Sequence, residues 1–136
     1  MADEIQALIN LSITKNGTSA SGSSSLSQTL SGNNYQSYIL DVTLSAASSK
    51  QLVAIDAGIA TGGWIMLKNN LSETSNTSTS AMITVGNHST AGGTLAILGP
   101  TQAVLLQNHA ALYVAASGAT AGTGTPIQLA VVVSEP

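Results

Sequence analysis

The sequence predicts an all-β fold, a sandwich or barrel built from eight to ten short strands. Apolar residues alternate with polar ones over short segments, which is the periodicity of half-buried strands. Turn-forming residues separate these segments at intervals of about ten residues. The apolar segments contain mainly Leu, Ile, Val and Ala, and phenylalanine is absent. This composition is typical of closely packed sheets.

The N-terminal part of the chain, residues 1–34, is expected to hold one strand and a Ser/Gly-rich arm. The strand is predicted from alternating Ile9, Leu11 and Ile13. Turn chemistry at 15–17 then ends it. Residues 17–25 consist only of Gly, Ser, Thr and Ala, a composition typical of a flexible linker or a long surface loop. The acidic start of 3–11 also allows one or two helical turns.

Residues 35–136 are expected to form the β-sandwich domain. Its clearest strand covers 38–44, in which Tyr38, Leu40 and Val42 share one face and Asp41 points away from it. The other strand candidates are a weak one at 26–30, just before this domain, and those at 52–55, 64–68, 82–86, 95–98, 103–106, 111–115 and 127–133.

The chain carries very little charge. Three lysines and six acidic residues are its only formal charges, whereas about a quarter of a typical domain is charged. Ser and Thr supply a quarter of the residues instead. Such a surface loses little when it gives up water for a partner's polar groups, which favours packing against other copies or other proteins.

The same composition argues against several other classes of function. Three cations are too few to neutralise a phosphate backbone, so we expect no nucleic-acid partner. The longest apolar runs are about five residues, far short of the roughly 20 that span a bilayer, so we expect no membrane partner. The N-terminus lacks the cationic and apolar regions of a signal peptide, so we expect synthesis in the cytoplasm.

No constellation of titratable residues predicts an active site or a metal centre. His88 and His109 lie beside asparagines without metal-ligand spacing, and loop positions explain them better. Asp41 and Asp56 could in principle form a catalytic carboxylate pair, but solvated or backbone-capping roles are favoured. Lys50 follows two serines and is interpreted as marking the start of a strand. We therefore expect no enzymatic activity, no cofactor and no metal.

The aromatic residues are candidates for contacts. The sole tryptophan, Trp64, opens a strand after a glycine pair, and core packing is the preferred interpretation. Tyr35 is expected in a loop and is the better interface candidate. The residues predicted to contact other subunits are Ile9, Leu11, Ile13, Tyr35 and Tyr38.

Several turn–strand motifs of residues 35–136 resemble the small all-β structural proteins of tailed bacteriophage virions. The motifs are Gly63-Trp64 continuing to Asn69, Ile83–Gly86, Leu98-Gly99-Pro100 before Val104–Leu106, and Leu112–Ala116. Related proteins often carry a Pro-Gly-Glu turn where Gly99-Pro100-Thr101 stands here.

The resemblance implies a jelly-roll-like antiparallel β-sandwich of about eight short strands with a flexible N-terminal segment. It also implies a homo-oligomer, a dimer or trimer, located in the virion. The expected function is that of a capsid decoration protein that binds the major capsid protein or another virion protein. A tail, collar or fibre-base component is the nearest alternative. A glycan-binding jelly roll using Trp64 or Tyr35 is a further one, and an enzyme is the least favoured.

Overall fold

A computed structural model of the chain describes residues 4–29, 34–43, 49–59, 63–71, 82–90, 92–107, 111–117 and 127–135. Within these residues the secondary structure consists of ten β-strands. The chain divides into two compact units, Met1–Asn33 and Asn34–Pro136. The first is a hairpin, and the second is a two-layered sandwich.

The hairpin consists of β1 (Glu4–Lys15) and β2 (Thr18–Thr29), paired without interruption along both strands. Asn16 and Gly17 form the turn with φ values of 53° and 79°. Two consecutive positive φ angles are what a two-residue hairpin turn needs, and Asn-Gly is the sequence that adopts them most readily.

Two expectations for this region are wrong. Residues 18–25 belong to a strand and not to a loop, and the segment from Glu4 is a strand and not a helix. β2 consists mostly of small and polar residues and has no apolar periodicity, so its sequence does not predict a strand. It pairs because the turn brings it beside β1 and because its backbone groups form hydrogen bonds with those of β1.

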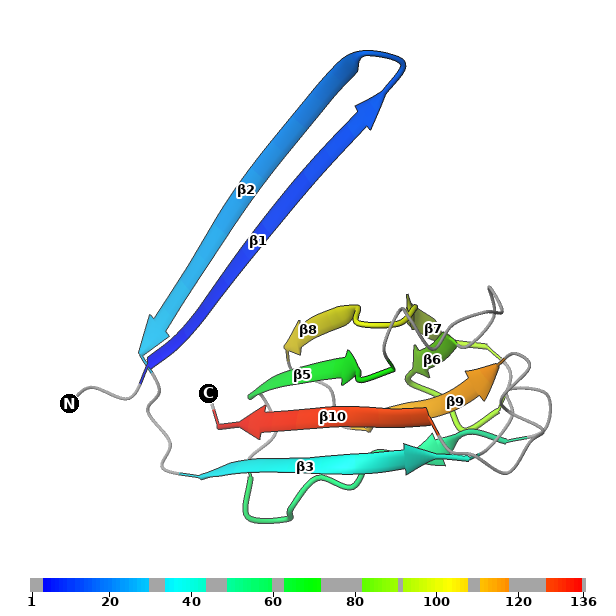
Figure 1. The fold of residues 1–136 in the computed structure, drawn as a ribbon. Coiled ribbons are helices and arrows are strands. Elements are labelled where there is room, and N and C mark those ends of the chain that lie inside the picture. The colour runs from blue at the N-terminus through cyan, green and yellow to red at the C-terminus, as the bar shows by residue number, and fades with distance from the viewer. Residues whose placement is uncertain are drawn as a thin grey trace. The chain divides into compact units, whose positions relative to one another are not determined.

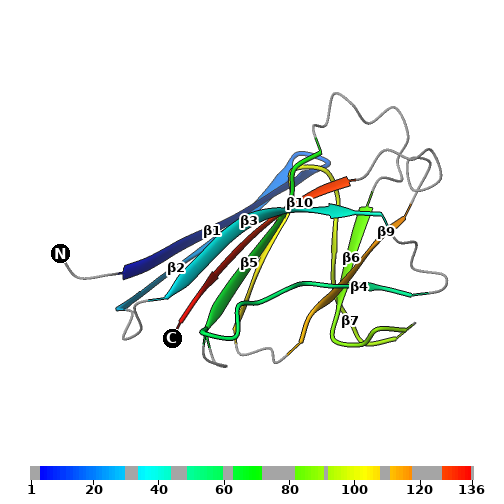
Figure 2. The same cartoon turned by 90° about the horizontal axis from the view of Figure 1, so that it is seen from below.

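The sandwich contains eight strands in two antiparallel sheets (Figures 1 and 2). The strands are β3 (Tyr35–Val42), β4 (Gln51–Leu52), β5 (Trp64–Asn69), β6 (Met82–Gly86), β7 (Thr94–Leu98), β8 (Ala103–Gln107), β9 (Tyr113–Ser117) and β10 (Ile127–Ser134). The first sheet has the order β3-β10-β5-β8, and the second sheet has the order β4-β9-β6-β7.

The strand pairing is nested. β6 pairs with β7, β5 with β8, β4 with β9 and β3 with β10. This pattern arises when one long antiparallel hairpin of four strand pairs is rolled into two layers, which is the jelly-roll topology. The predicted jelly-roll-like β-sandwich of about eight strands is therefore confirmed.

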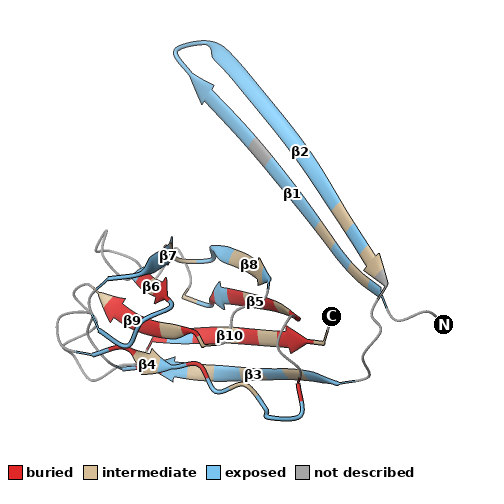
Figure 3. Ribbon diagram, turned by 180° about the vertical axis from the view of Figure 1, so that it is seen from behind, coloured by how far each residue is buried: buried red, intermediate tan, exposed pale blue. Residues whose placement is uncertain are grey.

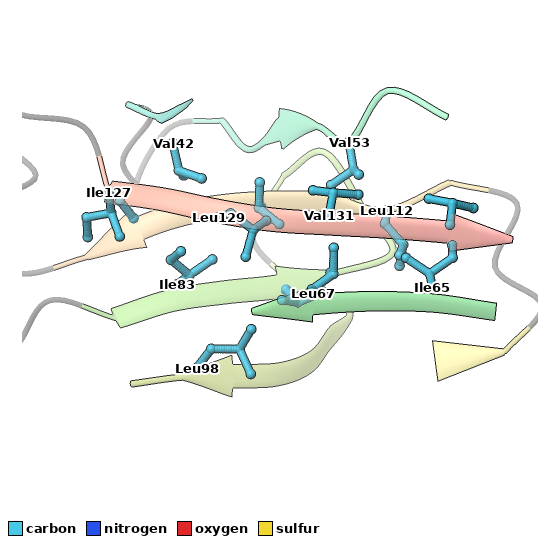
Figure 4. Close-up of a cluster of buried hydrophobic side chains, with 14 of the residues drawn as sticks. Val42, Val53, Ile65, Leu67, Ile83, Leu98, Leu112, Ile127, Leu129 and Val131 are labelled. Atoms are coloured by element: carbon cyan, nitrogen blue, oxygen red, sulfur yellow. The ribbon is translucent and has the colours of Figure 1, made fainter. Parts of the chain in front are cut away.

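The core lies between the two sheets and is built almost entirely from Leu, Ile and Val (Figures 3 and 4). In β10, buried residues alternate with more exposed ones up to Val133, as they do in β5 from Ile65 onward. Alternation follows from the strand's period of two, which points successive side chains to opposite sides of a sheet. The largest fully buried apolar side chains include Leu67, Ile83, Leu112, Ile127 and Leu129.

Two buried polar side chains stabilise the sandwich. Asn69 of β5 donates from Nδ2 to the Leu98 carbonyl of the other sheet at 3.2 Å, and its Oδ1 accepts from the Leu71 amide at 3.0 Å. Buried Lys50, directly before β4, donates from Nζ to the Gly92 carbonyl at 2.8 Å. Both side chains therefore have structural partners, as buried polar groups require.

The chain enters the sandwich at a fixed point. The Asn34 Nδ2 group donates to the Gly58 carbonyl and to Glu135 Oε1, each at 3.1 Å. The Glu135 amide in turn donates to the Asn34 carbonyl at 3.1 Å. These bonds place the first and last described residues of the sandwich side by side.

Candidate assembly surfaces

The first sheet carries large apolar residues on the side that faces away from the core as well as on the side that forms it. Residues paired across antiparallel strands lie on the same face, so the register places Val132, Met66 and Leu105 in one row facing outward. We name this surface the outer face. Its apolar residues are Tyr35, Ile39, Trp64, Met66, Ala103, Leu105, Ala130 and Val132. The register also places Ser37, Asp41, Lys68, Gln107, Gln128 and Ser134 on this face.

The outer face is largely uncharged and partly exposed. Tyr35 is 78% exposed and Ile39 is 52% exposed, while Trp64 and Met66 are half-buried. The charged side chains of the four strands are Asp41 and Lys68. An antiparallel sheet with one wet face normally alternates apolar with polar residues. An outward face on which apolar residues from all four strands gather is typical of a surface that another protein covers.

Trp64 belongs to the outer face, so its predicted place in the core is wrong. It pairs with Ser134 and Gln107, whereas the next residue, Ile65, is buried in the sandwich. Ile65 and Leu67 point into the core, and successive residues of a strand point to opposite sides of the sheet. Trp64 therefore points away from the core. Large aromatic side chains at this kind of position are frequent centres of protein interfaces.

The two tyrosines predicted as contacts lie on opposite sides of β3. Tyr35 begins β3, and its side chain lies on the outer face. Tyr38 packs against the core, and its hydroxyl donates to the Ala54 carbonyl at 2.7 Å. Burial raises the pKa of Tyr38. Tyr38 therefore contributes to folding, while Tyr35 is available to a partner.

The hairpin presents a second apolar surface. The register places Ile5, Ala7, Ile9 and Ile13 of β1 on one side, opposite Gln28, Leu26, Ser24 and Ala20 of β2. Leu11 pairs with Gly22 in the same ladder. We name this side the apolar hairpin face. Ile9 and Ile13 are 63% and 53% exposed.

The other hairpin face is polar. It contains the alternate residues of β1, of which Leu8 is the one large apolar side chain, and serines at every second position from Ser19 to Ser27. The predicted contacts Ile9 and Ile13 thus share a face that differs sharply in chemistry from its reverse side.

The titratable residues that the structure describes do not assemble into a site. No group of three or more metal-ligating side chains occurs among the described residues. The Asp56 carboxylate accepts the Gly58 amide at 2.7 Å within its turn, and Asp41 and His88 are exposed. His109 lies outside the described residues. The described chain also holds no helix long and apolar enough to cross a membrane.

Comparison with models of known protein families, with curated proteins and with solved structures found no match to this chain. The fold and the two apolar surfaces are therefore the features that indicate a function.

Proposed function

We propose that this protein is a structural component of a bacteriophage virion, a decoration protein that binds the major capsid protein lattice as a homo-oligomer and stabilises the head. The observation that carries the proposal is the outer face, because a four-stranded sheet with apolar residues on both sides is suited to being covered by another protein. The resemblance of the turn and strand motifs to those of small virion proteins supports a location in a virion, and jelly rolls are a frequent architecture of such proteins.

The low charge supports the same conclusion. Copies that bind a lattice lie close to one another, and net charge would make them repel. In the first sheet the only charged strand residues are Asp41 and Lys68, which have opposite signs. A surface of this kind can pack densely against like copies and against a shell.

A binding assay on heads that lack the protein tests this function. Ile39→Asp places a charge on the outer face, and we expect it to reduce occupancy on the heads by at least about tenfold, since a buried unpaired charge is costly. Ile97→Asp is the matched control because Ile97 is similarly exposed, at 58%, on β7 of the second sheet. If both variants bind like the original chain, the outer face is not the contact.

The location is decided by a density map of the virion and by counting copies. A decoration protein is expected in hundreds of copies on the head, whereas a tail, collar or fibre-base component would be present in a few. The row that contains Tyr35 and Trp64 favours a glycan-binding module as a further candidate, because exposed aromatic rings can stack on sugars. A glycan array without any bound sugar would reject it.

A further inference from the structure

The apolar hairpin face has no second layer within the described part of its own unit. A two-stranded hairpin is marginally stable in water unless another layer covers its apolar side. Here the two strands pair over twelve residues each, and the side chains of Ile9 and Ile13 remain more than half exposed. A partner that covers this face would therefore stabilise the hairpin.

The shape of the apolar hairpin face points to the identity of that partner. In the half of the hairpin nearer the turn, β1 carries the large residues Ile9 and Ile13, whereas their partners on β2 are Ser24 and Ala20, with Gly22 between them. A methyl group added to Gly22 would meet no atom within 4 Å. Over this half the face is a ridge on β1 beside a shallow groove on β2, and toward the other end the small residue Ala7 pairs with Leu26. Because one surface carries both features, the ridge of one copy can fit into the groove of another copy.

We propose that the apolar hairpin face binds the same face of further copies of this chain, with the ridge of each hairpin in the groove of the next. Rotation about an axis parallel to the strands sets β1 of one copy against β2 of its neighbour, and all turns then point the same way. A two-fold axis perpendicular to the strands would instead place β1 of one copy against β1 of the other, so that the two ridges would meet and the two grooves would stay empty. Closed rotational symmetry of this kind is the usual arrangement of homo-oligomers.

The area available favours three copies over two. A strand of twelve residues is about 40 Å long and a two-stranded ribbon is about 10 Å wide, so one face offers about 400 Å². Two faces would bury about 800 Å² in total, which is the size of a crystal contact. Three faces around one axis bury about 1,200 Å² over the whole assembly, about 400 Å² from each copy, and they enclose a shared apolar core. The rest of the face is uncharged in the register, because Lys15 is its only charged residue and lies at the tip beside the turn, where its long side chain can extend into water.

The proposal deepens the homo-oligomeric part of the proposed function, but it requires no capsid and is tested on the purified full-length chain. Light scattering is expected to give the mass of a trimer at micromolar concentration. Ile9→Asp is expected to reduce that mass threefold, because it buries a charge in the shared core. Asn10→Asp, on the polar face next to it, is the matched control and is expected to leave the mass unchanged. A monomeric original chain, or a trimer that survives Ile9→Asp, would overturn the proposal.

Crosslinking provides a second measurement that does not depend on the folding of a charged variant. The chain contains no cysteine, so single substitutions can be crosslinked selectively. Ile9→Cys mixed with Ser24→Cys is expected to crosslink between chains with a bismaleimide that spans about 10 Å, the spacing of packed sheets. Asn10→Cys mixed with Ser23→Cys, a pair on the polar face, is the control and is expected to crosslink far less.

Equal crosslinking in the two mixtures would contradict the assignment of the interface to the apolar hairpin face. The two proposals can also fail separately. A trimer that does not bind heads refutes the decoration function alone, and a monomer that binds heads refutes the hairpin interface and the homo-oligomer but leaves the decoration function in place.

Discussion

Tyr38 shows how one residue connects folding to pH. Its ring is packed against the core and its hydroxyl is bonded to Ala54, so ionisation requires a charge in a partly buried site. Burial raises the pKa of Tyr38 above its ordinary value of 10.0. The stability that the neutral side chain contributes is complete below pH 10.0 and is lost as the pH rises through the raised folded-state pKa.

We predict that Tyr38→Phe removes this alkaline loss of stability. Near neutral pH the substitution should lower the free energy of unfolding by about 1 kcal/mol, because one hydrogen bond is lost. Above the pKa of the unfolded tyrosine, the difference between the two proteins should shrink as the pH rises. Urea denaturation across the alkaline range measures both values, and a constant difference would contradict the prediction.

At the scale of strands, the hairpin depends on the conformation of two residues. Gly17 adopts a φ of 79°, which side chains with a Cβ atom rarely tolerate. We predict that Gly17→Ala lowers the stability of the hairpin by about 1 kcal/mol. Amide hydrogen exchange of β1 and β2 measures this loss. Ser21→Ala, on the polar face of β2, is the control and should leave the exchange rates nearly unchanged.

How far the sequence predicts these strands depends on how each one is stabilised. Alternation over 38–44 correctly assigned the inner face of β3, because Tyr38, Leu40 and Val42 meet the core while their neighbours do not. Alternation cannot show which side of the sheet Trp64 faces, because β5 begins with consecutive apolar residues. The strand could therefore turn either Trp64 or Ile65 toward the core without changing its apolar periodicity. β2 has no alternation of large apolar residues, because most of its side chains are small or polar. It is a strand because its backbone pairs with β1 across the turn.

The assembly surfaces were predictable only in part for the same reason. Ile9 and Ile13 are correctly grouped on one face by their spacing, but the groove beside them requires the register with β2. The outer face depends on rows of residues from four strands that are distant in the sequence. Such rows follow from non-local pairing, which periodicity does not encode.

At the scale of the whole molecule, the sandwich is self-contained. Its core residues all lie between Val42 and Val133, and the bonds that fix its entry point join Asn34 to Gly58 and Glu135. We predict that residues 34–136 produced alone fold with a thermal midpoint within a few degrees of the full chain. Calorimetry measures the midpoint, and loss of a cooperative transition would show that the hairpin is needed for folding.

The nested pairing also sets the order in which the sandwich can fold. β6 and β7 are joined by a short connection, whereas β3 and β10 are separated by most of the sandwich sequence. Loop closure becomes more costly as the sequence separation grows, so folding is expected to proceed outward from β6 and β7 and to be slow. β10 pairs with both β3 and β5, so the strand of the sandwich that is synthesised last occupies the middle of the first sheet. During synthesis, the apolar sides of that sheet remain open until β10 has left the ribosome.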